Sequence, residues 1–158
     1  RIKEYADHFP GAEFHEGKRP WHVPCDIAMP CATQNEISED DARSLLSNGC
    51  TAVSEGANMP TDIAGINLFL DAKILFGPAK AANAGGVAMS GLEMSQNSER
   101  RSWGQEQLRE LLRSTMDGIH KRAYEAGVEA DGYCNYVRGA NIAGFKKVAD
   151  AMLAFGVV

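Results

Sequence analysis

The fold is decided by residues 25–32, which read CDIAMPCA and form a short apolar run. Such a run is typical of a strand buried on both faces of a parallel sheet. Ser38 and Asp41 follow as a predicted capping box, so we expect a helix to begin at Ser38. That helix should end at Asn48-Gly49, where glycine supplies the left-handed cap.

The same order of strand, loop and helix then recurs. Residues 51–55 predict a second strand, residues 61–72 a helix and residues 74–76 a third strand. Strands that alternate with helices of this length indicate βαβ units and a parallel sheet. Earlier in the chain, after a Pro10-Gly11 turn, residues 12–16 predict one more short strand.

From Gly85 onward the sequence predicts helices. Gly85-Gly86 should precede a helix that starts at residues 87–94. Apolar residues recur at three- and four-residue steps through residues 105–126, as on an amphipathic helix, and a last helix is expected at residues 141–155. We therefore expect an α/β protein with a largely helical C-terminal part, as one domain over residues 1–158.

Composition excludes several classes of protein. Of the 158 residues, 44% are hydrophobic and 23% charged, as in an average globular domain. A net charge of −5 argues against nucleic acid or an anionic membrane as partner. The longest uncharged run, residues 81–92, is shorter than the roughly 20 residues of a membrane span.

Cysteine and histidine spacings give no sign of a metal site. The histidines match no recognised ligand pattern, and the cysteines form no CxxC pair. We expect the thiols to be reduced, as in a cytoplasmic protein. These residues are His8, His15, His22, His120, Cys25, Cys31, Cys50 and Cys134.

Residues 139–146 imitate a phosphate-binding P-loop. Their lysine, Lys146, is displaced by one position, and no serine or threonine follows it. We favour a tight helix start that needs small residues. The dinucleotide fingerprint GxGxxG does not occur in the sequence.

Three polar loops follow the three predicted strands. They comprise residues 31–35, 56–60 and 80–87, and each carries an asparagine among small residues. In an open α/β sheet these loops lie at the carboxyl edge, where ligands bind. Asparagine offers donors and an acceptor that suit a carboxamide or a sugar hydroxyl. The alternative is that these residues are only turn formers.

Ser90 follows Gly85-Gly86 and is expected within about the first turn of its helix. Unpaired amides there favour an anion, so the hydroxyl could bind a substrate carboxylate. A local bond from Ser90 to a carbonyl of the preceding turn is the other interpretation. The residues alone leave both open.

Several long motifs resemble the cofactor domain of hexameric glutamate dehydrogenase, most closely its NADP-preferring microbial branch. They extend over essentially the whole chain, which therefore resembles the later, C-terminal part of that partial Rossmann-like domain. The motifs are residues 18–21, 24–28, 30–36, 55–61, 80–87, 90–98, 139–145 and 148–152.

The resemblance implies interconversion of L-glutamate with 2-oxoglutarate and ammonia, with NADP or NAD as cofactor. It implies that Ala32, Thr33, Asn58 and Asn83 line the cofactor cleft. Ser90 would hold a substrate carboxylate, and Val87 would line the same pocket. We therefore expect half a pocket, in which Asn58, Asn83 and Ser90 surround a common hollow.

The resemblance assigns no catalytic residue to this chain, because the family's catalytic lysine and aspartate have no counterpart in it. We therefore expect a fragment that is inactive alone, from a parent that forms a homohexamer. The strand at residues 25–31 should present an open edge and promote self-association.

Two alternatives stay open. One is a fragment of a related branched-chain or aromatic amino-acid dehydrogenase, although Ser90 favours glutamate because a distal carboxylate needs a polar partner. The other is a stand-alone binding or interaction module. The preference for NAD or NADP, and the role of Lys80, also stay open.

Overall fold

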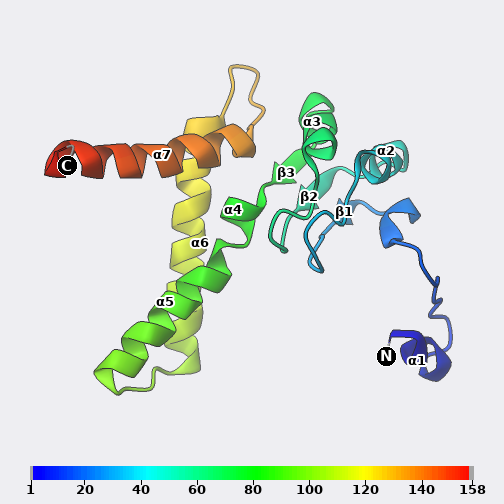
Figure 1. The fold of residues 1–158 in the computed structure, drawn as a ribbon, viewed down its shortest axis with the longest axis horizontal. Helices are drawn as coiled ribbons and strands as arrows, with labels where there is room; N and C mark the ends of the chain where they lie inside the picture. The colour runs from blue at the N-terminus through cyan, green and yellow to red at the C-terminus, as the bar shows by residue number, and fades with distance from the viewer. Residues whose placement is uncertain (1, 157–158) are drawn as a thin grey trace.

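The computed structural model describes residues 2–156. It is a mixed α/β structure with a three-stranded parallel sheet in the order β1-β2-β3. The strands are β1 (Ile27–Ala28), β2 (Ala52–Ser54) and β3 (Leu75–Gly77). Figure 1 shows this small sheet beside α2 (Glu39–Ser47) and α3 (Ile63–Asp71), with longer helices extending away from it.

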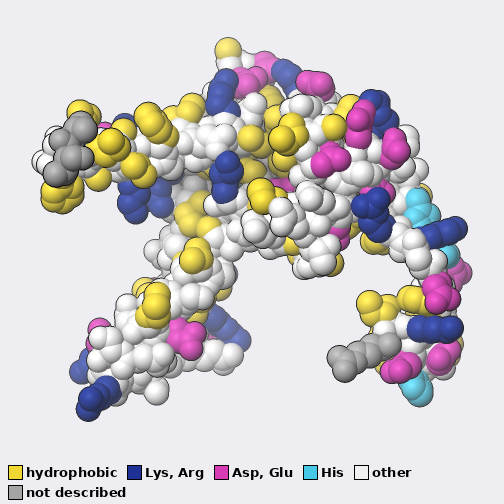
Figure 2. All heavy atoms as spheres, in the orientation of Figure 1, with side chains coloured by type: hydrophobic (Ala, Val, Ile, Leu, Met, Phe, Trp, Pro, Cys, Tyr) yellow, Lys and Arg dark blue, Asp and Glu magenta, His cyan; other side chains and the backbone are white. Residues whose placement is uncertain are grey.

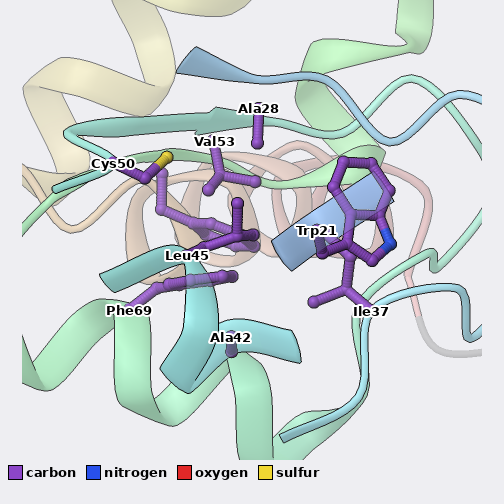
Figure 3. Packing of buried hydrophobic residues seen from close by; sticks show 9 residues of the cluster. Trp21, Ala28, Ile37, Ala42, Leu45, Cys50, Val53 and Phe69 are labelled. Carbon is purple, nitrogen blue, oxygen red and sulfur yellow. The ribbon is translucent and has the colours of Figure 1, made fainter. Parts of the chain in front are cut away.

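The sheet register explains which side of each strand is buried. Ala28, Val53 and Phe76 form one row across the three strands, and they are at most 2% exposed. They pack with Leu45 of α2 and Phe69 of α3 in a continuous core, most of which Figure 3 shows. One face of the sheet is therefore tightly packed by α2 and α3, the helices that follow β1 and β2 along the chain.

The opposite row of the sheet is open. Ile27 and Leu75 lie on either side of Ala52 and are 61% and 63% exposed. Beside this row a cavity of about 390 Å³ separates the sheet from Met116 and Ile119. The expectation that the first strand is buried on both faces is therefore wrong for this face, which residues 2–156 leave incompletely covered.

Capping residues place the starts of α2 and α3 within two residues of the predicted starts. Ser38 caps α2, and Asp41 completes the predicted capping box by accepting from the Ser38 amide at 2.9 Å. Gly49 takes the left-handed conformation after that helix, with φ of 85°. Asp62 caps α3 by accepting from the Gly65 amide, so this helix begins two residues later than predicted.

The helical part begins earlier than predicted. A short helix, α4 (Ala79–Ala82), follows β3, and α5 (Ala84–Glu99) starts immediately after Asn83. Gly85 and Gly86 therefore lie inside α5, not before it. The last helix, α7 (Tyr136–Phe155), starts five residues earlier than predicted because Asn135 caps it.

The two longest helices cross closely. The helix α6 (Gln105–Gly127) agrees with the predicted amphipathic helix, and α7 crosses its C-terminal part (Figure 1). Gly139 is buried in this crossing, where a side-chain carbon would overlap the carbonyl oxygen of Ala123. The interpretation of residues 139–146 as a helix start is wrong, because they lie inside α7; the need for a small residue holds at Gly139 and does not hold at Gly144, around which nothing lies within 4 Å.

The N-terminal region departs most from the prediction. It contains α1 (Ile2–His8), with no buried residue, and the one-turn helix η1 (Pro20–His22). The predicted strand at residues 12–16 is wrong: this segment is turn and coil. Figure 1 shows the segment away from the sheet, so it has no strand to pair with. Within residues 2–156 no helix is both long and apolar enough to span a bilayer.

Candidate functional site

The loops that follow the three strands meet around one cavity of about 750 Å³, which we call the loop hollow. It lies at the carboxyl ends of the strands, as predicted for an open α/β sheet. Its lining includes Gln34 and Asn35 from the first loop, Asn58 and Thr61 from the second, and Lys80 and Asn83 from the third. The convergence of the three segments is therefore confirmed, but the third is wrong as a loop, because residues 80–87 form most of α4 and the start of α5.

The first two loops are joined by backbone hydrogen bonds. The Asn35 amide donates to the Met59 carbonyl at 3.0 Å, and the Ile37 amide donates to the Pro60 carbonyl at 2.9 Å. Asn35 and Met59 both have positive φ, at 55° and 48°. This backbone conformation costs free energy for a residue other than glycine and is frequent at binding sites.

Asn83 joins the second loop to the third. Its side-chain nitrogen Nδ2 donates to the Ala57 carbonyl at 3.0 Å. Asn83 is partly buried and its backbone amide donates to the Ala79 carbonyl, whereas Asn58 is exposed. One amide side chain therefore holds the loops together and the other is available to a ligand.

Ala32 and Thr33 lie at the start of the first loop and are exposed. Their amides donate to Oε1 of Glu36, at 2.8 and 3.3 Å. The carbonyl of Glu36 accepts in turn from Nε1 of Trp21 at 2.9 Å. No local pattern predicts this role for Glu36, although its position four residues after Ala32 allows the contact.

Val87 and Ser90 lie outside the loop hollow. Ser90 is in the second turn of α5, because the helix starts at Ala84, and its hydroxyl donates to the Gly86 carbonyl at 3.2 Å. The expectation that Ser90 occupies the first turn is wrong, and the local bond is present. Ser90 lines a separate recess with Leu108, and Val87 is 74% exposed.

Asn83, Val87 and Ser90 nevertheless share one face of α5. They are spaced at i, i+4 and i+7, which places them in a row along the helix. With a rise of ~1.5 Å per residue, Ser90 lies roughly 10 Å beyond Asn83. The expectation that Asn58, Asn83 and Ser90 surround a common hollow is therefore wrong for Ser90, which lies further along the helix in a separate recess.

The titratable side chains that line the loop hollow already have partners. Asp62 accepts from the amides of Gly65 and Glu39, at 2.6 and 3.2 Å. Lys80, whose role the sequence left open, donates to Oδ1 of Asn141 on α7. Glu55 accepts two backbone amides. The lining is arranged to bind a ligand through backbone and amide groups, and no group of three metal-binding side chains gathers within residues 2–156.

The comparisons with known proteins agree with this geometry. Residues 1–156 match the family described as Glutamate/Leucine/Phenylalanine/Valine dehydrogenase. The chain belongs to this family.

Similar proteins cover the whole chain. It is 58% identical over 158 residues to a glutamate dehydrogenase of Bacteroides thetaiotaomicron. It is 59% identical over 157 residues to an NAD(P)-specific glutamate dehydrogenase of Xylanibacter ruminicola and 57% identical over 158 residues to an NADP-specific one of Salmonella typhimurium. Each match includes at least 99% of this chain. The chain spans 35% of the length of each of these relatives.

The fold is similar to solved structures of such enzymes. The crystal structure of Plasmodium falciparum glutamate dehydrogenase superposes with a TM-score of 0.94 and 46% identity, over 100% of this chain and 34% of that one. Relatives named as NAD-specific, NADP-specific and NAD(P)-specific all occur among the similar proteins. The family is therefore established for a chain about a third as long as these relatives.

Proposed function

We propose that this chain supplies the cofactor-binding wall of an NAD(P)-dependent glutamate dehydrogenase, which interconverts L-glutamate with 2-oxoglutarate and ammonia. The observation that carries the proposal is the loop hollow, where three loops from parallel strands meet with Asn58 exposed in its lining. Asn58, Asn83 and the loop of Ala32 and Thr33 would contact the dinucleotide. The 158 residues form one partial Rossmann-like domain.

The exposed row on α5 extends this wall towards the substrate. Val87 and Ser90 follow Asn83 on the same helix face, so a nicotinamide ring near Asn83 would have the substrate beside it. The Ser90 hydroxyl has a single proton, which it donates to the Gly86 carbonyl; to hold an ionised carboxylate, which only accepts, the hydroxyl would turn and donate that proton to the carboxylate instead. A distal carboxylate thus favours glutamate over aliphatic or aromatic amino acids.

The chain alone should bind dinucleotides but not turn over glutamate. Asp62, Glu55 and Lys80 are held by bonds within the protein, so we assign none of them to proton transfer. No glutamate-dependent reduction of NADP⁺ or NAD⁺ is expected from the 158-residue chain. Measurable turnover by this polypeptide would contradict the assignment.

Ligand-observed saturation-transfer NMR tests the binding site. The chain should transfer saturation to the protons of NADP⁺ or NAD⁺ at millimolar concentration, and Asn58→Ala should remove most of the signal. Asn97→Ala is a matched control, because Asn97 is equally an exposed asparagine but lies near the far end of α5. Equal signals from the two variants, or no signal from the parent chain, would contradict the proposal.

Self-association is the further consequence that we propose for this chain. Among the described residues β1 pairs with β2 alone, which leaves an open edge, and unpaired strand edges recruit other strands. In the longer parent we propose a homohexamer, located in the cytoplasm, where the four free thiols stay reduced. Light scattering that shows only monomer for the 158-residue chain would contradict self-association.

A further inference from the structure

Glu55 is a buried carboxylate in the wall of the loop hollow. It follows β2 directly and is 2% exposed. No ion pair between described residues includes it. A buried carboxylate needs compensating donors, so the partners of Glu55 indicate what it does.

Those partners are backbone amides of two different loops. Oε1 accepts from the Thr61 amide at 3.3 Å, and Oε2 accepts from the Ala79 amide at 2.7 Å. The Thr61 amide closes the loop that carries Asn58. The Ala79 amide begins α4, the short helix that ends at Asn83. One carboxylate therefore connects the two segments that carry the asparagines of the site.

The connection closes a ring of hydrogen bonds. From Glu55 it passes through Ala79 to Asn83, whose backbone amide donates to the Ala79 carbonyl at 3.0 Å. From Asn83 it returns through Nδ2 to the carbonyl of Ala57, two residues after Glu55. Each member of the ring limits the movement of the others, so Glu55 controls where Asn83 lies relative to the Asn58 loop.

A carboxylate offers one acceptor oxygen to each donor. Each of its oxygens faces an N–H group, and such charge-assisted bonds are stronger than neutral ones. A glutamine of the same shape would keep one acceptor and direct its NH₂ group at the other amide. Loss of an acceptor leaves a buried donor without a partner, which is costly.

We propose that Glu55 is a positioning residue, whose carboxylate sets the spacing of the Asn58 and Asn83 loops around the loop hollow. It acts through the backbone amides of Thr61 and Ala79. The role of this hollow in dinucleotide binding rests on the proposed function above, whereas the positioning itself can be measured without a ligand.

Hydrogen exchange in the ¹⁵N-labelled chain tests the proposal. Glu55→Gln should speed exchange of the Ala79 amide and of the Asn83 side-chain amide by about tenfold. Exchange at Leu45 and Phe69 in the core should change much less. Glu36→Gln is the matched control: it removes the carboxylate that holds Ala32 and Thr33, and it should leave Ala79 and Asn83 unchanged. Equal acceleration at the core, or no change at Asn83, would overturn the proposal.

A measurement on the unaltered chain decides the question if Glu55→Gln does not fold. Scalar couplings across hydrogen bonds should join the amide nitrogens of Thr61 and Ala79 to the side-chain carboxyl carbon of Glu55. A coupling should likewise join Nδ2 of Asn83 to the carbonyl carbon of Ala57, which closes the ring. Absence of the coupling from Ala79 to Glu55 would overturn the proposal.

Addition of NADP⁺ to the same samples separates the two hypotheses. Shifts at Asn58 and Asn83 in the unaltered chain, reduced in Glu55→Gln, support both. If the unaltered chain shows no shift with NADP⁺, the proposed function fails, and positioning by Glu55 is still decided by the exchange and coupling results.

Discussion

The sheet region and the helical region of this chain are packed very differently. In residues 20–83 the side chains of Ile37, Leu45 and Phe69 are fully buried. In residues 84–156 the buried residues are small, such as Ala123 and Gly139, and large apolar side chains are exposed along α7 (Figure 2). These include Phe145 at 74%, Leu153 at 84% and Phe155 at 85%.

This difference shows that an apolar pattern in the sequence does not by itself ensure that the side chains are buried. Both regions have the apolar periodicity of stable elements, but residues 2–156 contain a packing partner for only one of them. The loop hollow lies on the well-packed region, close to its junction with the other. We therefore expect stability to depend on the sheet region, while the helical region supplies surfaces that relatives three times as long can cover.

The largest effect should come from truncating the same residue type in each region. Leu45→Ala removes a side chain with no exposure and should cost about 3 kcal/mol of unfolding free energy, because it leaves a cavity. Leu153→Ala, at a side chain that is 84% exposed, should change it by less than about 0.5 kcal/mol. Urea unfolding followed by circular dichroism measures both, and similar costs would remove the distinction between the regions.

The crossing of α6 and α7 is tightly packed, unlike the exposed outer face of α7. Gly139→Ala should destabilise it by ~1–3 kcal/mol, since the new methyl group would overlap the Ala123 carbonyl. Gly144→Ala, one turn further on where nothing lies within 4 Å, should instead stabilise α7 by ~0.5–1 kcal/mol. Opposite signs in thermal unfolding are the expected result. A neutral Gly139→Ala would mean that the helices can separate freely.

Helix caps give a smaller contrast. Ser38→Ala removes the acceptor for the Asp41 amide and should cost about 1 kcal/mol. The start of α6 has Gly104 without a side-chain cap, so Gly104→Ser should stabilise the helical region by a few tenths of a kcal/mol. The two variants can be compared by urea unfolding. An unchanged midpoint for Ser38→Ala would show that tertiary packing alone holds α2.

These elements also show how far the sequence predicts the molecule. The capping box at Ser38, the glycine at residue 49 and the alternation of β1, α2, β2, α3 and β3 follow from local chemistry and are confirmed. The position of Ser90 was not, because the start of α5 depends on α4 and on the bond from Asn83 to Ala57. That bond joins residues 26 positions apart, and a local pattern contains no information about it.

The candidate site was predicted only in part for the same reason, since local patterns do not show hydrogen bonds between distant residues. Polar loops after strands predicted that Asn58 and Asn83 lie at one sheet edge. The roles of Glu36 and Glu55 went unnoticed, since each acts on backbone amides and leaves no signature in residue type. The one local indication for Glu55 is its position at the end of a predicted strand, and many surface glutamates occupy such a position as well.

The weakest expected effect concerns an ion pair between the two regions. Lys73, after α3, donates to Asp131 in the loop between α6 and α7, and its ammonium lies 5.5 Å from the centre of the Tyr133 ring. The hydrogen bond from Lys73 holds the pKa of Asp131 below its ordinary value of 3.8. Since the folded-state pKa is the lower one, the pair stabilises the fold above the ordinary pKa, and this contribution is lost as the pH falls through the lowered pKa.

Asp131→Asn should therefore reduce thermal stability slightly at pH 7 and make no difference once the pH is below the lowered pKa. Both side chains are about half exposed, so salt should weaken the effect. Thermal unfolding from pH 7 down to pH 2, at low and high salt, measures it, with Glu106→Gln as control because Glu106 pairs with Arg109 inside α6 alone. If the two variants differ at no pH, the junction depends on the apolar contacts and on the bond from Lys80 to Asn141, and the charges add nothing to it.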